Sequence, residues 1–236
     1  EQDTFKRMTE IIIEEIPESK NSTAVLSGPS HAEEVSRKIP TAVVCACGNS
    51  DISRNVQDLF LTQYFRVYTQ TDMVGVELGG ALKNIYAVGA GICDGLSLGD
   101  NTKAALLTRG LAEMIRLGKL MGGSKLTFAG LSGLGDLMVT CFSKHSRNRL
   151  LGEKIGSGKS VKAALSEMTM VAEGYPTAKS AYDLGIKLKI ELPVINEVYK
   201  TLYENKKPKL TVEALMGRSA KSEVESAEAY YLEARK

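Results

Sequence analysis

The sequence contains no tryptophan, two histidines and four cysteines in 236 residues. The cysteines form no CxxC pair, and the histidines, His31 and His145, are far apart in the chain. Transition metals are usually held by clustered Cys and His side chains, so we expect no metal site. The sequence shows no disulfide framework, and we interpret all four cysteines as buried, reduced thiols: Cys45, Cys47, Cys93 and Cys141.

A dominant charge of one sign is also lacking. The 30 Lys and Arg residues nearly balance the 28 Asp and Glu residues, and the net charge is +2. This balance gives no electrostatic footprint for nucleic acid, and the scattered aromatic residues give no platform for base stacking. No apolar run is free of polar residues over the length of a membrane span, and no signal peptide is evident. We therefore expect a cytoplasmic protein with no nucleic-acid partner and no membrane insertion.

The first 72 residues alternate between short apolar strands and short helices. Apolar and β-branched runs predict strands at 23–26, 41–47 and 64–69, and the second is apolar enough to be buried on both faces. Periodicity and capping residues predict helices at 3–16, 31–38 and 51–61, with a capping box between Ser30 and Glu33. This alternation is typical of the end of an open α/β sheet.

After Asp72 every periodic segment is predicted to be helical. Long helices are expected at 74–95 and from a cap at Asp100 or Asn101 to 122. A glycine-rich corner at 130–135 precedes shorter helices at 137–142, 146–155, 161–168, 177–188, 193–204 and 212–216. The acidic tail after Lys221 is expected to be a surface helix or to fray. We predict two domains, an α/β part at 1–72 and an all-helical part at 73–236.

Lys83 lies deepest among apolar residues in the first long helix. Its neighbours on the same helix face are Gly79, Gly80, Tyr86 and Ala87, and three of these are small enough to leave space beside the amine. Burial disfavours the ammonium form of a lysine, so an amine in such a place can exchange a proton near neutral pH. Lys83 is therefore a candidate general acid–base. The alternative is a structural helix whose lysine reaches water.

Polar residues further along supply two more candidates. Asp136 follows the glycine corner, where it either caps the next helix or presents its carboxylate to a ligand hydroxyl or to Lys83. Ser146, Arg147 and Asn148 open a helix, where free N–H groups, a hydroxyl, an amide and a guanidinium suit a phosphate. The alternative for this segment is a capped surface helix with a solvated arginine.

Two glycine patterns suggest nucleotide-binding loops but fail on context. The segment GEKIGSGKS at 152–160 has the wrong glycine spacing for a P-loop and follows a charged helix. The glycines at 130–135 lack the preceding strand of a dinucleotide fingerprint. No phosphate-binding GxGxxG pattern occurs in the chain.

Six segments together resemble the bacterial NAD(P)-dependent glycerol-3-phosphate dehydrogenases. They are SGPSHAEEV (27–35), PTAVV (40–44), GVELGGALKNIYAVGAGICDGL (75–96), NTKAALLTRGLAEM (101–114), GLSGLGDLMVTCFSKHSRNRLLG (130–152) and VAEGYPTAK (171–179). Several motifs of this length in this order are specific, and the resemblance covers nearly the whole chain. The family's amino-terminal glycine fingerprint does not occur, so the chain is expected to be the second two-thirds of such an enzyme.

The resemblance implies a fold and an activity. The fold is an α/β remnant of a Rossmann-type domain, followed by an all-α substrate domain similar to the C-terminal domain of 6-phosphogluconate dehydrogenase. The reaction interconverts sn-glycerol 3-phosphate and dihydroxyacetone phosphate by hydride transfer with NAD or NADP, and it feeds glycerophospholipid synthesis. The assembly is a cytoplasmic homodimer. We expect this chain by itself to turn over poorly.

The resemblance also implies roles for individual residues. Lys83 is the implied proton acceptor for the C2 hydroxyl. Substrate contacts are implied for Gly28, Ser30, Lys83, Asp136, Ser146, Arg147 and Asn148, and cofactor contacts for Ala32, Arg147, Val171 and Glu173. His31 stands where relatives often carry an aromatic residue, and it receives no role.

Two alternatives stay open at this point. A related two-domain dehydrogenase, of the 3-hydroxyacyl-CoA or 6-phosphogluconate type, would share the architecture, although the Ser-Arg-Asn segment at 146–148 favours a small phosphorylated alcohol. Because the dinucleotide fingerprint is lacking, the chain could instead be a catalytically incomplete helical dimer module.

Overall fold

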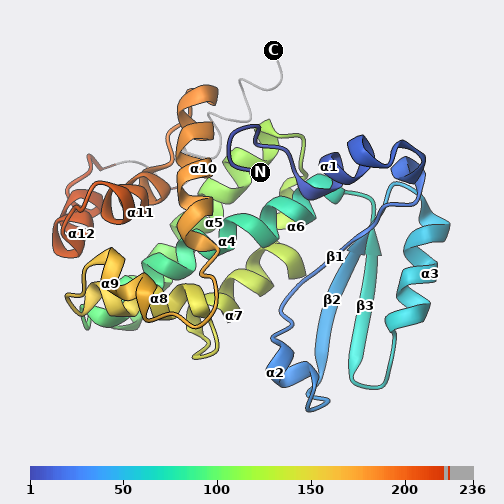
Figure 1. The fold of residues 1–236 in the computed structure, drawn as a ribbon, viewed down its shortest axis with the longest axis horizontal. Helices are drawn as coiled ribbons and strands as arrows, with labels where there is room; N and C mark the ends of the chain where they lie inside the picture. The colour runs from blue at the N-terminus through green and yellow to red at the C-terminus, as the bar shows by residue number, and fades with distance from the viewer. Residues whose placement is uncertain (221–222, 224–236) are drawn as a thin grey trace.

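A small sheet with flanking helices adjoins a larger body of helices in the computed structural model of the chain (Figure 1). The structure describes residues 1–220 and Glu223, so the prediction for the tail after Lys221 otherwise lies outside the described residues. The predicted order, an α/β part followed by helices, is confirmed. The change occurs between β3 and α4, and the division into two domains at 72–73 stays a prediction.

The sheet has the order β1-β2-β3, with β1 (Val25–Ser27) antiparallel and β3 (Phe65–Gln70) parallel to the central β2 (Thr41–Ala46). Helix α3 (Ser50–Phe60) connects the two parallel strands. Val43 and Cys45 pack on one face of the sheet with Val56 of α3, whereas Val44 and Ala46 pack on the other with Val76 of α4. The central strand is therefore buried on both faces, as its apolar sequence predicts.

Three local predictions in the α/β part are wrong. Helix α1 (Met8–Glu15) begins later than residue 3, because Phe5 has a left-handed backbone, with φ of 61°. It is followed by a 3₁₀ turn, Pro17–Asn21. Helix α2 is only Ala32–Val35 long, and its N-cap residue, His31, makes no side-chain cap. The hydroxyl of Ser30 donates to the carbonyl of Gly28 at 3.0 Å, so the predicted capping box does not form.

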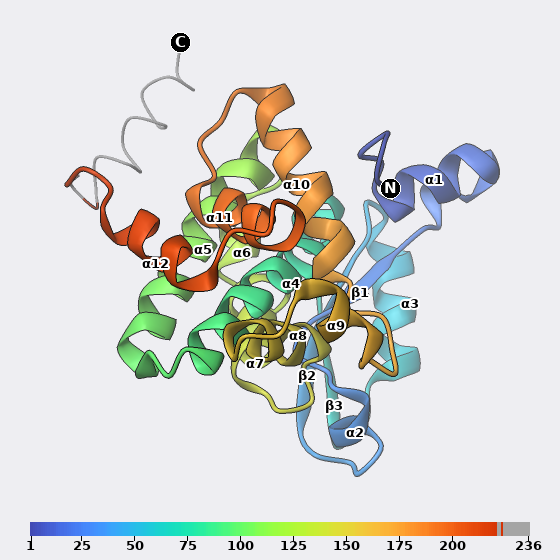
Figure 2. The same cartoon turned by 60° about the vertical axis from the view of Figure 1, so that its left-hand side comes forward.

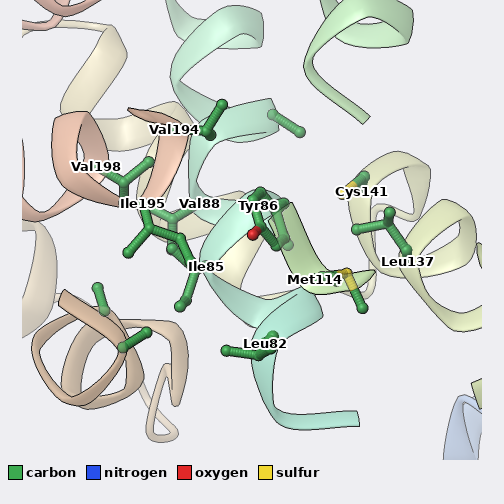
Figure 3. Packing of buried hydrophobic residues seen from close by; sticks show 14 of the residues in the cluster. Leu82, Ile85, Tyr86, Val88, Met114, Leu137, Cys141, Val194, Ile195 and Val198 are labelled. Carbon is green, nitrogen blue, oxygen red and sulfur yellow. The ribbon is translucent and has the colours of Figure 1, made fainter. Parts of the chain in front are cut away.

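Helix α4 (Met73–Gly95) is the centre of the helical body (Figure 2). Around it pack α5 (Gly99–Leu120), α7 (Asp136–Phe142), α8 (Arg147–Gly156), α10 (Gly174–Leu188) and α11 (Pro193–Tyr203). Figure 3 shows side chains of α5, α7 and α11 meeting those of α4 around Tyr86, which is fully buried. Smaller elements complete the body: α6 (Lys125–Phe128), a turn of π-helix (Leu131–Gly135), α9 (Val161–Ser166) and α12 (Pro208–Met216).

One predicted helix cap in this body is wrong. Helix α5 begins at Gly99 and its N-cap residue is Leu98, so neither Asp100 nor Asn101 has the capping position. The four cysteines are free and buried, as expected. No single helix of the described residues is long and apolar enough to cross a membrane; a bent pair, Lys125–Phe142 with Arg147–Gly156, meets that test only jointly.

Glycines bring α8 unusually close to α4. A Cβ atom on Gly91 would lie 1.9 Å from the Arg149 carbonyl oxygen, and one on Gly152 would lie 2.0 Å from the Val88 carbonyl oxygen. Such distances are far below van der Waals contact, so the two backbones touch along this line only because both positions lack a side chain. The contact places the N-terminus of α8 beside the middle of α4.

Two carboxylates connect the sheet part to the start of α4. Asp72 caps α4 by accepting from the Gly75 N–H at 2.8 Å, and its second oxygen accepts from the Ser124 N–H at 2.8 Å and the Thr127 hydroxyl at 2.6 Å. One turn later Glu77 accepts from the N–H and hydroxyl of Thr9, at 2.9 and 2.6 Å. Arg7 pairs with the same carboxylate at 2.8 Å. These bonds fix the N-terminal segment around Thr9, and the connection between β3 and α4 at Asp72, to the helical body.

Candidate functional site

Lys83 and Asp136 form an ion pair between α4 and the first residue of α7. The Lys83 side chain is 17% exposed and that of Asp136 is 5% exposed, so of the two only the lysine side chain has partial access to water. Gly135 occupies the N-cap position of α7, and Asp136 makes no cap. The sequence allowed Asp136 either to cap α7 or to present its carboxylate. In the structure the carboxylate contacts Lys83.

Asp136 is further held by Thr140, one turn along α7. The Thr140 hydroxyl lies 2.6 Å from the Asp136 carbonyl oxygen and 3.2 Å from its Oδ1. Burial raises the pKa of the Asp136 carboxyl above its usual value, while the Lys83 ammonium and the Thr140 hydroxyl act in the opposite direction. The pair is a buried carboxyl facing a partly hydrated amine.

The small residues beside Lys83 do not leave open space, and this expectation is corrected. A Cβ on Gly79 would lie 2.5 Å from the Ser132 carbonyl oxygen, and one on Gly80 would lie 3.1 Å from the Ser27 hydroxyl. The glycines thus admit the π-helical turn and the end of β1. They bring those two segments against the helix of Lys83.

An amide network lies directly beside this pair. The Asn148 amide donates to Asn84 Oδ1 at 3.0 Å, and its own oxygen accepts from the Gly174 N–H at 2.7 Å. The Asn84 amide donates to the Gly80 carbonyl at 3.3 Å and to Glu173 Oε2 at 3.4 Å. The residue next to Lys83 therefore links α4, the N-terminus of α8 and the residue that precedes α10.

The N-terminus of α8 has the features of an anion site in part. Ser146 is the N-cap, its oxygen accepting from the Arg149 N–H at 3.2 Å, and both Ser146 and Asn148 are buried. Within the described chain, the backbone N–H groups of Arg147 and Asn148 have no recorded acceptor, and the exposed Arg147 guanidinium has no recorded partner. The N–H groups and the guanidinium remain available, while the serine hydroxyl and the amide already serve the fold.

The loop after β1 brings the sheet edge to the same place. Gly28 has φ of +145°, and a Cβ there would lie 2.9 Å from Val43 Cα, so no other residue fits without strain. The ring of Pro29 approaches Gly135, with its Cδ 3.8 Å from where a Cβ would stand. Gly28 and Ser30 are thus close to the residue that precedes Asp136.

The predicted cofactor contacts are at accessible positions. Ala32 and Arg147 are exposed, and Val171 is 69% exposed. Glu173 is exposed and bonds to Asn84, as described above. No contact between Val171 and the other predicted site residues is recorded in the described part of the chain, so that residue is near the site only through the loop that leads to Glu173.

Sequence reasoning missed three residues of this site. Thr140 lies four residues after Asp136, so helix periodicity alone places both on one face, and that signal was available. The link made by Asn84 and the position of His31 depend on segments distant in sequence. The His31 ring lies 6.1 Å from the ring of His145, between centroids, although the two residues are 114 positions apart in the chain (145 − 31).

Comparison with known proteins gives a consistent result. Two family models match: the NAD-dependent glycerol-3-phosphate dehydrogenase C-terminus over residues 72–213, and the corresponding N-terminus over residues 1–53. A glycerol-3-phosphate dehydrogenase [NAD(P)+] from Lysinibacillus sphaericus is 52% identical over 226 residues, which are 95% of this chain and 67% of the relative. That from Bacillus cytotoxicus is 54% identical over 224 residues, covering 94% of the chain and 66% of the relative.

Solved structures agree with these matches. The chain aligns with a glycerol-3-phosphate dehydrogenase from Coxiella burnetii at a TM-score of 0.81 and 45% identity, covering 83% of this chain and 60% of the other. The yeast enzyme aligns at a TM-score of 0.78 and 26% identity, covering 87% and 62%. The chain thus spans about two thirds of the length of the curated relatives that it matches.

Proposed function

Because the chain belongs to the NAD-dependent glycerol-3-phosphate dehydrogenase family, we propose that it carries the proton-transfer and substrate-binding half of a hydride-transfer reaction. The reaction interconverts sn-glycerol 3-phosphate and dihydroxyacetone phosphate with NAD or NADP. The observation that supports it most is the Lys83–Asp136 pair beside the N-terminus of α8. Family membership also supports a cytoplasmic homodimer that feeds glycerophospholipid synthesis.

Lys83 is the proposed proton carrier. In the reduction of dihydroxyacetone phosphate, its ammonium donates a proton to the carbonyl oxygen at C2; in the oxidation of glycerol 3-phosphate, the neutral amine accepts the proton of the C2 hydroxyl. Asp136 positions the amine and provides a counter-charge, and Thr140 fixes the orientation of that carboxylate. The proton thus moves between Lys83 Nζ and the C2 oxygen of the substrate.

The phosphate is proposed to bind at the N-terminus of α8. Two free backbone N–H groups and the Arg147 guanidinium offer charge-assisted hydrogen bonds there. Ser146 and Asn148 hold the first turn of α8 in place. Gly28 and Ser30 lie in the loop after β1 that approaches Gly135, and they are the proposed contacts from the sheet edge. The phosphate and the reacting C2 carbon of the substrate are thus bound by different residues.

The chain's residues fit one end of a nicotinamide dinucleotide. The nicotinamide, when bound, supplies the hydride acceptor or donor. Ala32, Arg147, Val171 and Glu173 are exposed, and Glu173 bonds to the residue next to Lys83, so they are the proposed contacts to that group. The glycine fingerprint for the pyrophosphate does not occur in this sequence, so the fit concerns only the portion beside Lys83.

Substitution of Lys83 tests this function. Lys83→Ala should lower kcat for dihydroxyacetone phosphate by roughly 10²–10⁴, the usual range for a general acid–base, with an unchanged circular dichroism spectrum. The measurement is made with a full-length enzyme of the family that carries these residues. Equal turnover of a 3-hydroxyacyl-CoA or of 6-phosphogluconate by the unsubstituted enzyme, or activity of the variant within a factor of ten, would overturn the assignment.

A further inference from the structure

Two buried side-chain polar atoms in the described chain have no hydrogen-bond partner, His31 Nε2 and Ser132 Oγ. Both belong to segments that line the Lys83 centre, the loop after β1 and the π-helical turn before Asp136. A buried polar atom without a partner costs free energy comparable to a lost hydrogen bond, and native proteins rarely retain one without a function. Ser132 is enclosed, at 1% exposure, whereas His31 is only partly buried.

The surroundings of His31 indicate what its Nε2 would bind. It lies between Ser30 and Ala32, and its ring is tilted against that of His145, the residue before the N-cap of α8. The Glu33 carboxylate accepts a hydrogen bond from its own backbone N–H, which lowers the pKa of that carboxyl. His145, His31 and Arg147 add to that lowering, so these basic side chains share one neighbourhood. The basic groups gather on the side where α8 begins.

We propose that His31 is a substrate-binding residue whose Nε2 donates a hydrogen bond to a phosphate oxygen of the triose phosphate. This inference rests on the function proposed above and adds a donor from the sheet part to those of α8. A phosphate oxygen is the fitting acceptor because Lys83 and Asp136 already occupy the carbonyl end of the substrate. The phosphate is thereby held from both sides, by α8 and by the loop after β1.

Three variants separate the donor from the ring that carries it. His31→Phe keeps an aromatic ring and removes the donor, whereas His31→Gln keeps an N–H in a similar place. His145→Phe is the matched control, because it removes the exposed imidazole 6.1 Å away. Dissociation constants for dihydroxyacetone phosphate are measured by calorimetric titration of this chain, and KM and kcat are measured in the full-length enzyme that carries the same substitutions.

We expect His31→Phe to weaken binding of dihydroxyacetone phosphate roughly 10-fold or more, the loss that follows from one charge-assisted hydrogen bond. KM should rise to match, with kcat within about 3-fold, because the donor acts on the phosphate in ground and transition states alike. His31→Gln should recover most of the loss, and His145→Phe should change binding less than 2-fold. Dihydroxyacetone, which lacks the phosphate, should not distinguish the variants.

The imidazole ¹⁵N spectrum gives a readout in a protein that keeps His31. The chain has two histidines, so the spectrum of His145→Phe assigns the signals. Addition of dihydroxyacetone phosphate should shift the ¹⁵N resonance of His31 Nε2, and addition of dihydroxyacetone should not. If the His31 Nε2 resonance did not move and His31→Phe bound dihydroxyacetone phosphate normally, the role of His31 would be overturned and the proposed function would stand. Absence of any dihydroxyacetone phosphate binding by the unsubstituted chain and enzyme would overturn both.

Discussion

Asp136 gives the Lys83 ammonium a charged partner at a point where water reaches only part of the side chain. The ion pair also fixes the position of this lysine. If Nζ moved away, it would leave a buried carboxylate without a counter-charge, which costs free energy. The partner is itself fixed by Thr140. The acid–base group is therefore a unit of three side chains on two helices, α4 and α7.

Arg147 offers a test of the anion site at the scale of one side chain. Arg147→Ala should weaken the binding of phosphate-bearing substrates by roughly 1.5–3 kcal/mol, the free energy of a hydrogen bond to a charged group. It should raise KM more than it lowers kcat. Arg147 is exposed, so the melting temperature should hardly change. An unaltered KM for dihydroxyacetone phosphate would count against phosphate binding at α8.

Glu113 is a buried carboxylate far from this chemistry. Its two oxygens accept from the N–H groups of Val194 and Ile195, at 2.7 and 3.1 Å, and so cap α11 from α5. Burial raises the pKa of this carboxyl from 4.5 to about 7, although those two bonds and the nearby Arg116 and Arg109 lower it. A group whose pKa is higher in the folded protein favours folding most when it is protonated.

This sign gives a pH prediction for Glu113→Gln, which cannot titrate. As pH rises from about 4.5 to about 7, the unsubstituted protein should lose stability relative to the variant, by an amount on the order of 3 kcal/mol. Above that range the difference should stay level. Urea unfolding at several pH values measures it, and a difference that does not vary with pH would show that folding does not raise the pKa of Glu113.

At the scale of elements, the contact between α4 and α8 determines where the proposed phosphate site lies. Gly152→Ala would insert a methyl group 2.0 Å from the Val88 carbonyl oxygen. Overpacking of this kind costs about 1–3 kcal/mol, of which the better helix propensity of alanine offsets up to about 1 kcal/mol. The displaced α8 should also loosen the bond between Asn148 and Asn84 and lower kcat.

Gly48→Ala is the matched control, because a Cβ there meets nothing within 4 Å. Its free energy of unfolding, from urea titration, should change by less than about 0.5 kcal/mol. Equal stability and activity of the two variants would show that α8 can move away from α4 without consequence.

Helices and strands were predictable from periodicity, while several of their ends were not. The apolar run of β2 and the long apolar period of α4 each specify one element. Helix α2, by contrast, is four residues long, and Lys38, within the longer helix predicted there, has a left-handed backbone, with φ of 58°. The hydroxyl of Ser30, predicted to cap that helix, donates instead to the carbonyl of Gly28. Such choices depend on contacts that the local sequence does not contain.

The same distinction applies to the site. The approach of the Asp136 carboxylate to Lys83 was one of the interpretations that the sequence allowed, and the structure has it. The roles of Lys83, Asp136 and Arg147 stay predictions. The interpretation of the glycines near Lys83 was wrong, because the sequence shows that a position is small but not what fills the space. Gly79 and Gly80 receive Ser132 and Ser27, from segments 53 residues later (132 − 79) and 53 residues earlier (80 − 27).

At the scale of the whole molecule, Asp72 connects the linker, α4 and α6. Asp72→Ala removes the helix cap and leaves the Ser124 N–H without its acceptor, which together should cost about 2–4 kcal/mol. Asp72→Asn keeps an oxygen for the cap and should cost less. Scanning calorimetry should show one transition for the unsubstituted protein and a broadened or divided one for Asp72→Ala. A single transition at an unchanged temperature in Asp72→Ala would show that the hydrogen bonds of Asp72 contribute nothing to the cooperativity of unfolding.

The amide of Asn84 has a consequence for ligand binding that follows from its being shared. Any molecule that drew the Glu173 carboxylate away would leave an N–H of Asn84 unpaired beside Lys83, and a substrate that accepted from that N–H would compensate the loss. The affinities for two such molecules are then reciprocally linked, each raising the other. Binding at the loop before α10 and binding at Lys83 would thus be cooperative through one side chain, with no movement of either helix.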